Sequence, residues 1–425
     1  MSREEESTTN KRVALADLRP GMYVVGLDRS WLQTPFLFHR KLIQRDEEID
    51  QMRKHGIREV VIDIARGVDV VDGQKSDGEI TNRPAEEPAV EVKSAAAQRP
   101  PSPAELAFQP MVRELEQART IHDEALTLAQ SIFDGAGRGT AIDGEVAGRV
   151  VTSLRDSIMR SPEANLLLMQ MRRLQNDLFT HAVNVCVLSL VVATVEKLGD
   201  DFAALGTAAL LHDLGETRLP RSLLRKENNL TETETNLLTQ HPILGAALLA
   251  GSKDIPAAAQ RIIVDHHERI DGSGYPAGET DLTVYTQLVA LTDSYDDMLS
   301  GRNRAQLQPT EVLRQLYLQA NGGTVDRDLV ERVIRSLGVY PVGSVVELNT
   351  GEWGLVVAAN RSSALKPTVR LIMSRSGLMQ SNGPIIGLGE AAGDAVERRV
   401  VAIRDPLKEG IDPMAFLRTV PGMSA

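Results

Sequence analysis

The chain has 425 residues, and its 47 Lys and Arg against 58 Asp and Glu give a formal net charge of −11. At about 150 residues per domain, this length predicts about three domains. The single cysteine, Cys186, excludes an internal disulfide framework and every cysteine-based zinc ribbon or cluster. The acidic balance argues against binding of a nucleic-acid polymer, which requires a basic face.

The N-terminal residues MSREEESTTNKR are charged and contain no apolar core of a secretory signal. The longest strongly apolar stretch, Cys186 to Val195, is about half of the roughly 20 residues that a bilayer helix needs. We therefore expect no membrane span and a cytoplasmic location.

The first part of the chain, residues 1–71, contains short strand-like runs broken at Pro20-Gly21, then a charged helix over 46–55 and an apolar strand over 59–64. This pattern predicts a small α+β N-terminal module. Residues 72–105 are rich in proline and have no apolar period, which is typical of a disordered linker.

The middle of the chain is predicted to be entirely helical. Residues 106–168 form a helical lead-in, with a glycine-rich interruption over 135–139 and a second helix over 143–159. Ser161-Pro162 is a typical helix start, and it predicts one apolar helix through Leu198.

Further helices are predicted up to residue 338, so residues 169–338 form a central all-α bundle. The remaining residues, 339–425, contain β-rich runs separated by Gly, Asn and Pro, which predict a small β-rich C-terminal module. The fold class is therefore multidomain, with a helical domain between two small modules.

Five of the eight histidines lie between residues 181 and 267, each near another potential metal ligand. His181 follows Asp177 by four residues, which on a helix places both on one face. The His212-Asp213 pair ends an apolar helix that begins near Ala203. The set selected in this way is Asp177, His181, His212, Asp213, His241, His266, His267 and Asp293.

Imidazoles and carboxylates without thiolates suit Fe, Mn or Zn, and a carboxylate such as Asp213 can bridge two ions. Two ions about 3.5–4 Å apart can share a hydroxide and hold a phosphodiester for in-line attack. Any single histidine is more often a satisfied core or surface residue, and His39, His55 and His122 are assigned to that class. The cluster as a whole predicts phosphoester hydrolysis.

Three motifs carry a family resemblance: HDLGETRLP at 212–220, HPILG at 241–245 and HHERIDGSGYP at 266–276. From about Met169 to Arg304 the chain resembles the HD-GYP family, a bacterial branch of the HD phosphohydrolases. The resemblance implies an HD-type helical domain and a metal-dependent phosphodiesterase that hydrolyses cyclic di-GMP to pGpG or GMP. It also implies two or three divalent ions, with Fe or Mn as the usual metals.

Matched position by position, the resemblance implies that the residues from His181 to Asp293 in the set above are metal ligands, with Asp213 as the bridge. Asp177 matches a position associated with a third ion. Arg302 matches a basic residue that contacts substrate phosphate, and Arg304 is a second candidate. His267 or a water would protonate the leaving 3′ oxygen.

The segment Asp271 to Gly274 is predicted to form a tight loop, because its glycines permit close backbone approach. Gly274 and Tyr275 then become candidate contacts for a base of the substrate or for a partner protein. Alternatively, the loop is a rigid cap on the metal site. Glu268 and Asp271 are candidates for hydrogen bonds to the ligating histidines.

Two positions depart from the family pattern. Glu216 stands where the family usually has a phosphate-binding Lys, and Asp297 stands where it usually has Ala. A catalytically weak scaffold that binds a cyclic dinucleotide or a GGDEF-type cyclase therefore remains an alternative, as does an HD phosphohydrolase for another nucleotide.

The N-terminal module resembles a domain of unknown function often found ahead of HD-GYP domains. The helices before the bundle are compatible with a homodimer and equally with packing inside one chain.

Overall fold

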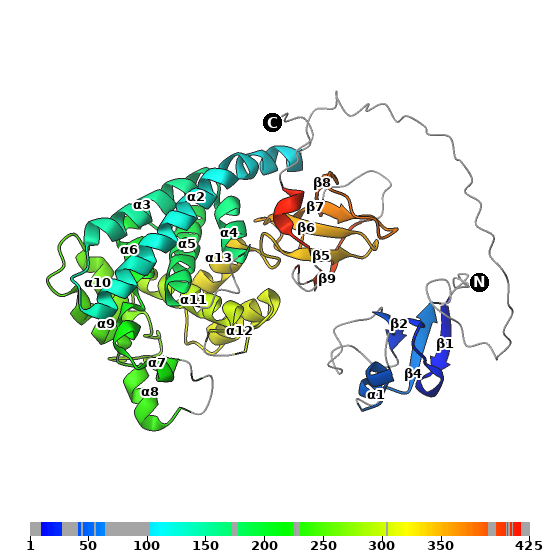
Figure 1. The fold of residues 1–425 in the computed structure, drawn as a ribbon, viewed down its shortest axis with the longest axis horizontal. Helices are drawn as coiled ribbons and strands as arrows, with labels where there is room; N and C mark the ends of the chain where they lie inside the picture. Colours follow the sequence, from blue (N-terminus) through cyan, green and yellow to red (C-terminus); the bar gives the residue numbers. More distant parts are fainter. Residues whose placement is uncertain are drawn as a thin grey trace. The chain divides into compact units, whose positions relative to one another are not determined.

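The computed structural model divides the chain into two compact units, Met1–Glu91 and Val92–Ala425, which are described separately (Figure 1). The residues that it describes are 10–27, 41–43, 46–54, 57–63, 103–171, 177–224, 226, 230–302, 305–389, 397–404, 406, 409 and 411–417. Most of the predicted linker lies outside these residues. Its last three residues belong to a helix that begins at Pro103.

The first unit contains a four-stranded antiparallel sheet in the order β1-β4-β2-β3, together with helix α1 and a 3-10 turn. Ile49 and Met52 of α1 are three residues apart and join the buried core of this unit. The elements are β1 (Asn10–Ala14), η1 (Leu15–Asp17), β2 (Tyr23–Leu27), β3 (Lys41–Leu42), α1 (Asp46–Lys54) and β4 (Glu59–Asp63).

The second unit begins with a long helix, α2 (Pro103–Arg138), which packs against α3 (Gly144–Arg160) and α4 (Pro162–Met171). The predicted interruption at residues 135–139 is wrong in its position, because α2 continues through Gly135 and Gly137 to Arg138. A glycine costs a helix only about 1 kcal/mol. The burial of Phe133 and Ala136 on the same turns of α2 outweighs this cost.

The single apolar helix predicted from Ser161 to Leu198 is wrong, because the structure has two helices in this region. Helix α4 ends at Met171 and α5 (Leu178–Glu196) begins after Asp177, whose backbone is extended. The carboxylate of Asp177 accepts a hydrogen bond from the backbone N–H of Thr180 at 2.8 Å, as an N-cap does.

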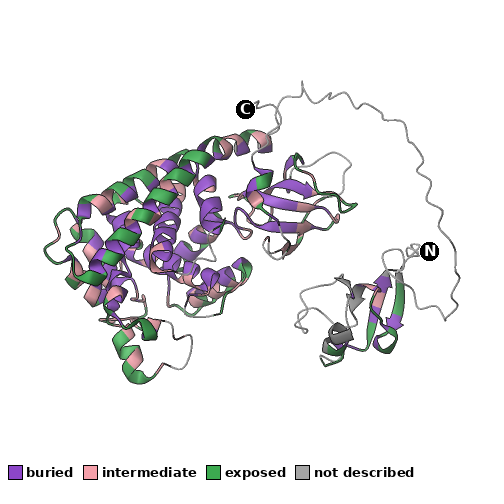
Figure 2. Ribbon diagram, viewed as in Figure 1, coloured by how far each residue is buried: buried purple, intermediate pink, exposed green. Residues whose placement is uncertain are grey.

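Helix α5 lies at the centre of the bundle and packs against α2, α6, α11 and α13. Figure 2 shows α5 buried, while α2 and α3 each expose one side. The elements that follow α5 are α6 (Phe202–Leu211), η4 (Leu214–Arg218), α7 (Arg221–Leu224), α8 (Glu232–Leu238), α9 (His241–Leu249), α10 (Ala257–Asp265), α11 (Val284–Ser300), α12 (Pro309–Asn321) and α13 (Arg327–Leu337).

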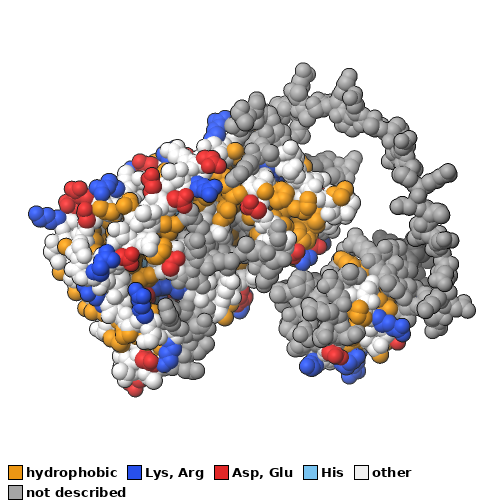
Figure 3. Space-filling model, in the orientation of Figure 1, with side chains coloured by type: hydrophobic (Ala, Val, Ile, Leu, Met, Phe, Trp, Pro, Cys, Tyr) orange, Lys and Arg blue, Asp and Glu red, His pale blue; other side chains and the backbone are white. Residues whose placement is uncertain are grey.

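Helix α5 has the length and apolar composition of a membrane span, with a mean hydropathy of 2.0, but 78% of its apolar window is buried inside the fold. Its apolar side chains therefore pack against other helices, as in the core of a helical domain. Over the described surface drawn in Figure 3, acidic and basic side chains are interspersed.

The C-terminal part is β-rich, as predicted, and forms a five-stranded antiparallel sheet in the order β8-β7-β6-β5-β9. Val345, Leu355, Ile372 and Phe416 belong to the same buried cluster as the helices, so this sheet and the bundle share one core. The elements are β5 (Val345–Leu348), β6 (Trp353–Ala358), β7 (Thr368–Met373), β8 (Ile385–Gly387), β9 (Val400–Arg404) and η5 (Pro413–Phe416).

Candidate metal centre

Seven predicted ligands from five helices meet inside the bundle. Most of them lie at the end or the start of a helix, where the chain can turn a side chain inward. They are His181 in α5, His212 and Asp213 directly after α6, His241 at the start of α9, His266 and His267 directly after α10, and Asp293 in α11.

The first group of ligand atoms lies between α5, α6 and α11. The Nε2 atoms of His181 and His212 are 3.2 Å apart, and Oδ1 of Asp293 lies 3.2 Å and 3.6 Å from them. Oδ2 of Asp213 lies 3.7 Å from His181 Nε2 and 3.5 Å from His212 Nε2. Two imidazoles and two carboxylates therefore surround one point.

The second group lies between α9 and α10. His241 Nε2 is 3.3 Å from His266 Nε2 and 3.1 Å from His267 Nε2. Oδ1 of Asp213 lies 3.3 Å from His241 Nε2 and 3.7 Å from His266 Nε2. Each oxygen of Asp213 therefore faces a different group of ligands, which is the arrangement of a bridging carboxylate.

Backbone carbonyls fix the protonation of three of these rings. The Nδ1 atoms of His212, His241 and His266 lie 2.7–2.9 Å from the carbonyl oxygens three residues earlier in the chain. A carbonyl oxygen can only accept, so each Nδ1 carries a proton and donates it. In the neutral rings, the lone pairs of the Nε2 atoms then converge on the two groups, where a cation can bind them.

Close backbone contact brings the two groups together. A Cβ atom on Gly215 would lie 1.9 Å from the carbonyl oxygen of His241 and 2.5 Å from the backbone nitrogen of Gly245. Only glycine therefore allows η4 to lie this close to the start of α9. This contact places His241 beside Asp213.

Asp296 orients His181, although it is not among the site residues predicted from the sequence. Its Oδ2 lies 2.8 Å from His181 Nδ1, and its Oδ1 accepts a hydrogen bond from Nδ2 of Asn184 at 3.1 Å. His181 is therefore held with Nε2 toward the cluster, as carboxylates commonly hold metal-ligating imidazoles. The spacing of three residues from Asp293 to Asp296 on one helix was the available clue.

One predicted site residue is not brought into the cluster, and a second lies outside the described residues. Asp177 caps α5, where Oδ2 accepts a hydrogen bond from Thr180 Oγ1 at 2.9 Å, and it is in none of the ligand groups among the described residues. Its role as a ligand of a third ion remains a prediction. Arg304 lies outside the described residues.

The loop from Asp271 to Pro276 covers the second group. A Cβ atom on Gly274 would lie 2.4 Å from the Cα atom of Glu268, so the loop backbone requires glycine there. The ring of Tyr275 stacks on His267, with a centroid distance of 4.6 Å and an interplanar angle of 26°. This contact matches the interpretation of the loop as a cap.

The predicted hydrogen bonds from Glu268 and Asp271 to ligating histidines are wrong. Oε1 of Glu268 accepts from the backbone N–H groups of Ala277 and Gly278 at 2.6 Å and 3.0 Å. Oδ1 of Asp271 accepts from Ser273. Both carboxylates therefore accept hydrogen bonds from residues of this loop region instead of from the ligating histidines.

Arg302 enters the cluster from the turn after α11. Gly301 ends this helix with a φ of 77°, and the buried guanidinium that follows donates from Nη1 to Oδ2 of Asp213 at 2.7 Å. Its Nη2 donates to Glu216, and Nη1 lies 3.4 Å from Oδ1 of Asp297. The two positions that depart from the family pattern therefore both contact Arg302.

Charges in the cluster shift the pKa values in opposite directions. Burial opposes the charge on His212, but Asp213 and Asp293 outweigh it and raise the pKa of this histidine. Burial and neighbouring histidines lower the pKa of His267 well below its usual value. The pKa of Asp213 is well below its usual value, because His212 and Arg302 outweigh its burial.

Desolvation and the nearby carboxylate of Asp293 raise the pKa of Asp297 to about 6. Burial raises the pKa of Glu216, an effect that Arg302 opposes. The pKa of Arg302 is raised well above its usual value, because Glu216, Asp213 and Asp297 outweigh its burial.

The donor set fits divalent metal ions. The ligand atoms of Asp213, His241, His266 and His267 lie within 4.8 Å of one another. The same holds for the trio His181, His212 and Asp213 and for the trio His181, Asp293 and Asp297. Imidazole and carboxylate donors suit Fe, Mn and Zn. His241, His266 and His267 make the second group rich in imidazole, whereas the first group has as many carboxylates as imidazoles.

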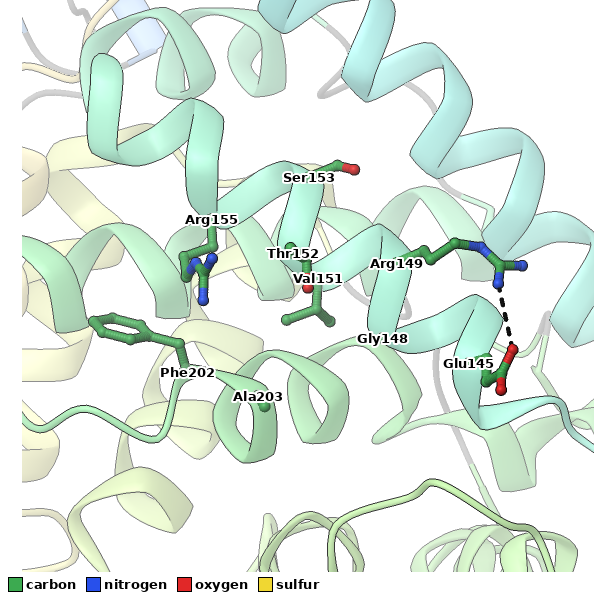
Figure 4. Close-up of a pocket in the computed structure, with 9 residues that line it drawn as sticks. All are labelled: Glu145, Gly148, Arg149, Val151, Thr152, Ser153, Arg155, Phe202 and Ala203. Atoms are coloured by element: carbon green, nitrogen blue, oxygen red, sulfur yellow. Dashed lines mark ion pairs between the residues drawn. The ribbon is translucent and has the colours of Figure 1, made fainter.

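A surface hollow of about 530 Å³ lies elsewhere, between α3 and the start of α6. Figure 4 shows that Arg149 on this surface pairs with Glu145, at 3.8 Å. Phe202 contributes an apolar wall. None of the cluster residues lines it, so the hollow does not bear on the chemistry of the cluster.

Three family models match the chain. An HD domain matches residues 168–329, a KOW domain associated with HD domain matches residues 345–392, and a domain of unknown function (DUF3391) matches residues 10–147. The last match extends beyond the N-terminal module into α3.

Curated relatives match over different lengths. The chain is 31% identical over 392 residues to cyclic di-GMP phosphodiesterase PA4108 of Pseudomonas aeruginosa, covering 90% of this chain and 89% of that protein. It is 35% identical over 147 residues to the cyclic di-GMP phosphodiesterase response regulator RpfG of Xanthomonas campestris, covering 33% of this chain and 39% of that protein.

A third relative is the 3'3'-cGAMP-specific phosphodiesterase 2 of Vibrio cholerae, which is 30% identical over 131 residues, covering 30% of this chain and 25% of that protein. The HHERIDGSGYP motif, the HD-domain match and the near full-length relative together show that the chain belongs to the HD-GYP family of HD-domain proteins.

Proposed function

We propose that this protein is a metal-dependent phosphodiesterase that hydrolyses cyclic di-GMP to pGpG or GMP. The observation that carries the proposal is Asp213, whose two carboxylate oxygens each face a separate set of imidazoles. Relatives named for this activity, one of them matched over 90% of this chain, support the choice of substrate.

Two divalent ions, Fe or Mn in this proposal, would supply the activation of water and the polarisation of the phosphodiester. His181, His212, Asp213 and Asp293 would hold one ion, and Asp213, His241, His266 and His267 would hold the other. A third ion, with Asp177 as a ligand, remains part of the proposal.

The residues of the chain prepare the site in three ways. Asp296 orients His181, carbonyl groups in the last turns of α6, α8 and α10 orient three other imidazoles, and Tyr275 covers His267. Burial of the cluster excludes bulk water, which strengthens every charge interaction inside it. Arg302, beside Asp213, is the candidate for contact with a phosphate oxygen.

Protonation of the leaving 3′ oxygen is assigned to water in this proposal. The low pKa of His267 keeps its ring neutral, which suits a ligand better than a proton donor. Gly274 holds the loop backbone against Glu268, and Tyr275 stacks on His267, so in this proposal both act through the cap. Direct contact of these two residues with a base of the substrate is the alternative.

The test is hydrolysis of cyclic di-GMP by full-length protein purified without oxygen and loaded with Fe²⁺ or Mn²⁺. We expect pGpG or GMP, and loss of both bound metal and turnover in the double variant His212→Ala with Asp213→Ala. Hydrolysis that survives removal of all metal would contradict the proposal.

A scaffold function is favoured by one observation, the burial of Glu216 against Arg302, which compensates a positive charge at the cluster. This function includes binding of a GGDEF-type cyclase through the loop around Tyr275. Loaded metal, tight binding of cyclic di-GMP and no product in the same assay would select it.

A panel of cyclic dinucleotides tests the remaining alternative, since one relative is named for 3'3'-cGAMP. Faster hydrolysis of another member of the panel would change the substrate and leave the mechanism. A cytoplasmic location and a homodimer remain part of the proposal.

A further inference from the structure

One guanidinium lies among three carboxylates at the edge of the metal centre. Arg302 is only 9% exposed, and its donors reach Asp213 at 2.7 Å, Glu216, and Asp297 at 3.4 Å. Burial of a charge is costly without such partners. The three carboxylates explain how this arginine can be buried.

Glu216 is the partner whose position in the chain links it to the ligands. It lies in η4, three residues after Asp213, and is only 5% exposed. Its carboxylate accepts a hydrogen bond from Nη2, on the side of the guanidinium away from the Nη1 contacts. The ion pair therefore forms inside the fold and next to the bridging ligand.

An anion at the cluster would interact electrostatically with both Arg302 and Glu216. Arg302 attracts it, and the carboxylate of Glu216, which accepts a hydrogen bond from Nη2 of Arg302, repels it. Because Coulomb energy falls only with the inverse of distance, and buried charges are poorly screened, the carboxylate cancels much of the attraction.

Loss of Glu216 would leave the guanidinium in place. Its Nη1 donors are held from the other side by Asp213 and Asp297. Loss of Glu216 would therefore remove the repulsion with little movement of Arg302. The electrostatic effect then determines the direction in which the affinity for phosphate changes.

We propose that Glu216 is an affinity-determining residue of this site, which weakens the binding of phosphate groups by neutralising Arg302. This inference rests on the proposed function for the identity of the substrate. The electrostatic effect on phosphate binding does not depend on the proposed function. It predicts a site that turns over its substrate chiefly when the substrate is abundant.

The experiment compares Mn²⁺-loaded full-length wild type with Glu216→Gln. Isothermal titration gives the Kd of inorganic phosphate, steady-state kinetics give KM and kcat for cyclic di-GMP, and elemental analysis gives the metal content. We expect the Kd and the KM to fall about threefold to tenfold in Glu216→Gln, with KM changing more than kcat.

Two further variants separate this effect from a general one. Glu331→Gln removes the partner of Arg327 in another glutamate–arginine pair, at 3.2 Å on the exposed face of α13, and should leave the Kd unchanged. In Arg302→Gln, the added Glu216→Gln change should bring a much smaller gain, because there is no guanidinium left to release.

An unchanged or higher Kd of phosphate in Glu216→Gln, at full metal content, would overturn the inference. If wild type does not hydrolyse cyclic di-GMP, the proposed function fails, but the ratio of the two phosphate Kd values still decides the role of Glu216. Glu216→Met, which is neutral and of similar volume, replaces Glu216→Gln if the latter does not fold.

Discussion

Nδ1 of His181 lies 2.8 Å from Oδ2 of Asp296, so a carboxylate on α11 fixes which nitrogen of an α5 histidine faces the metal cluster. Asp296→Asn would still fill the space, but an amide can turn its N–H₂ group toward the ring. We expect metal affinity to fall about 10-fold to 100-fold. Titration of metal-free protein with Mn²⁺ measures this.

Asp134→Asn on the exposed side of α2 is the matched control. It removes a carboxylate of the same size far from the cluster in the chain. Equal Mn²⁺ affinity of Asp296→Asn and the control would show that Asp296 does not orient His181.

The two groups of ligands should lose their ions separately. His266→Ala removes a ligand of the second group alone and should lower the metal content by about one ion per chain, whereas Asp213→Ala should lower it by about two. His122→Gln is the control, because His122 is also buried but pairs with Asn165 Oδ1 at 3.0 Å in another part of the bundle. Elemental analysis after dialysis distinguishes the three, and equal loss in all of them would contradict separate ion sites.

Gly215 should be irreplaceable even by alanine. A Cβ atom there would meet the carbonyl oxygen of His241, and we expect Gly215→Ala to lower the free energy of unfolding by about 3 kcal/mol or more. Gly137→Ala is the control, since a Cβ atom on this exposed helical residue has no heavy atom within 4 Å. It should raise the stability by about 0.5–1 kcal/mol. Chemical denaturation measures the free energy of unfolding of both variants. A Gly215→Ala variant as stable as Gly137→Ala would refute the close contact.

The two interpretations of Tyr275 predict different results for Tyr275→Phe. If the ring acts by stacking on His267, phenylalanine keeps the 4.6 Å contact, and both metal content and KM remain within about twofold of wild type. Tyr275→Ala removes the ring and should lower kcat/KM by about tenfold or more. A large rise in KM for Tyr275→Phe alone would instead assign the hydroxyl to the substrate.

Metal uptake should release protons. In the metal-free fold, neighbouring carboxylates outweigh burial and raise the pKa values of His181, His212 and His241 above 6.5. The stabilisation by these charged rings is fully present below 6.5 and is lost as the pH rises through the raised values. An ion takes the neutral ring, so binding at a pH below the raised pKa values must displace these protons.

The measurement is titration calorimetry with Mn²⁺ in two buffers of different ionisation enthalpy. We expect the binding enthalpies in the two buffers to differ by the amount that proton release gives. We also expect the metal affinity to fall as the pH is lowered from 8 to 6. Identical binding enthalpies in the two buffers would show that the three rings are already neutral.

Local sequence patterns predicted much of the structure. Apolar periodicity and capping residues predicted α3 and most helices of the bundle, because helix formation is largely a local property. The apolar run before His212 correctly placed this residue at a helix end. The same reasoning failed at Asp177, whose carboxylate accepts a hydrogen bond from the backbone N–H of Thr180 and caps the start of a separate helix, α5.

By itself, the sequence predicted the helical domain, the β-rich C-terminal part, the ligand types and the family, because these depend on composition, periodicity and motif spacing. Only the tertiary structure decided which oxygen of Asp213 faces which histidines, that Asp296 orients His181, and that Glu216 pairs with Arg302. Arg302 and Glu216 are 86 residues apart, and Asp296 and His181 are 115 residues apart. Contacts over such separations depend on how the helices pack, which no local pattern of residues specifies.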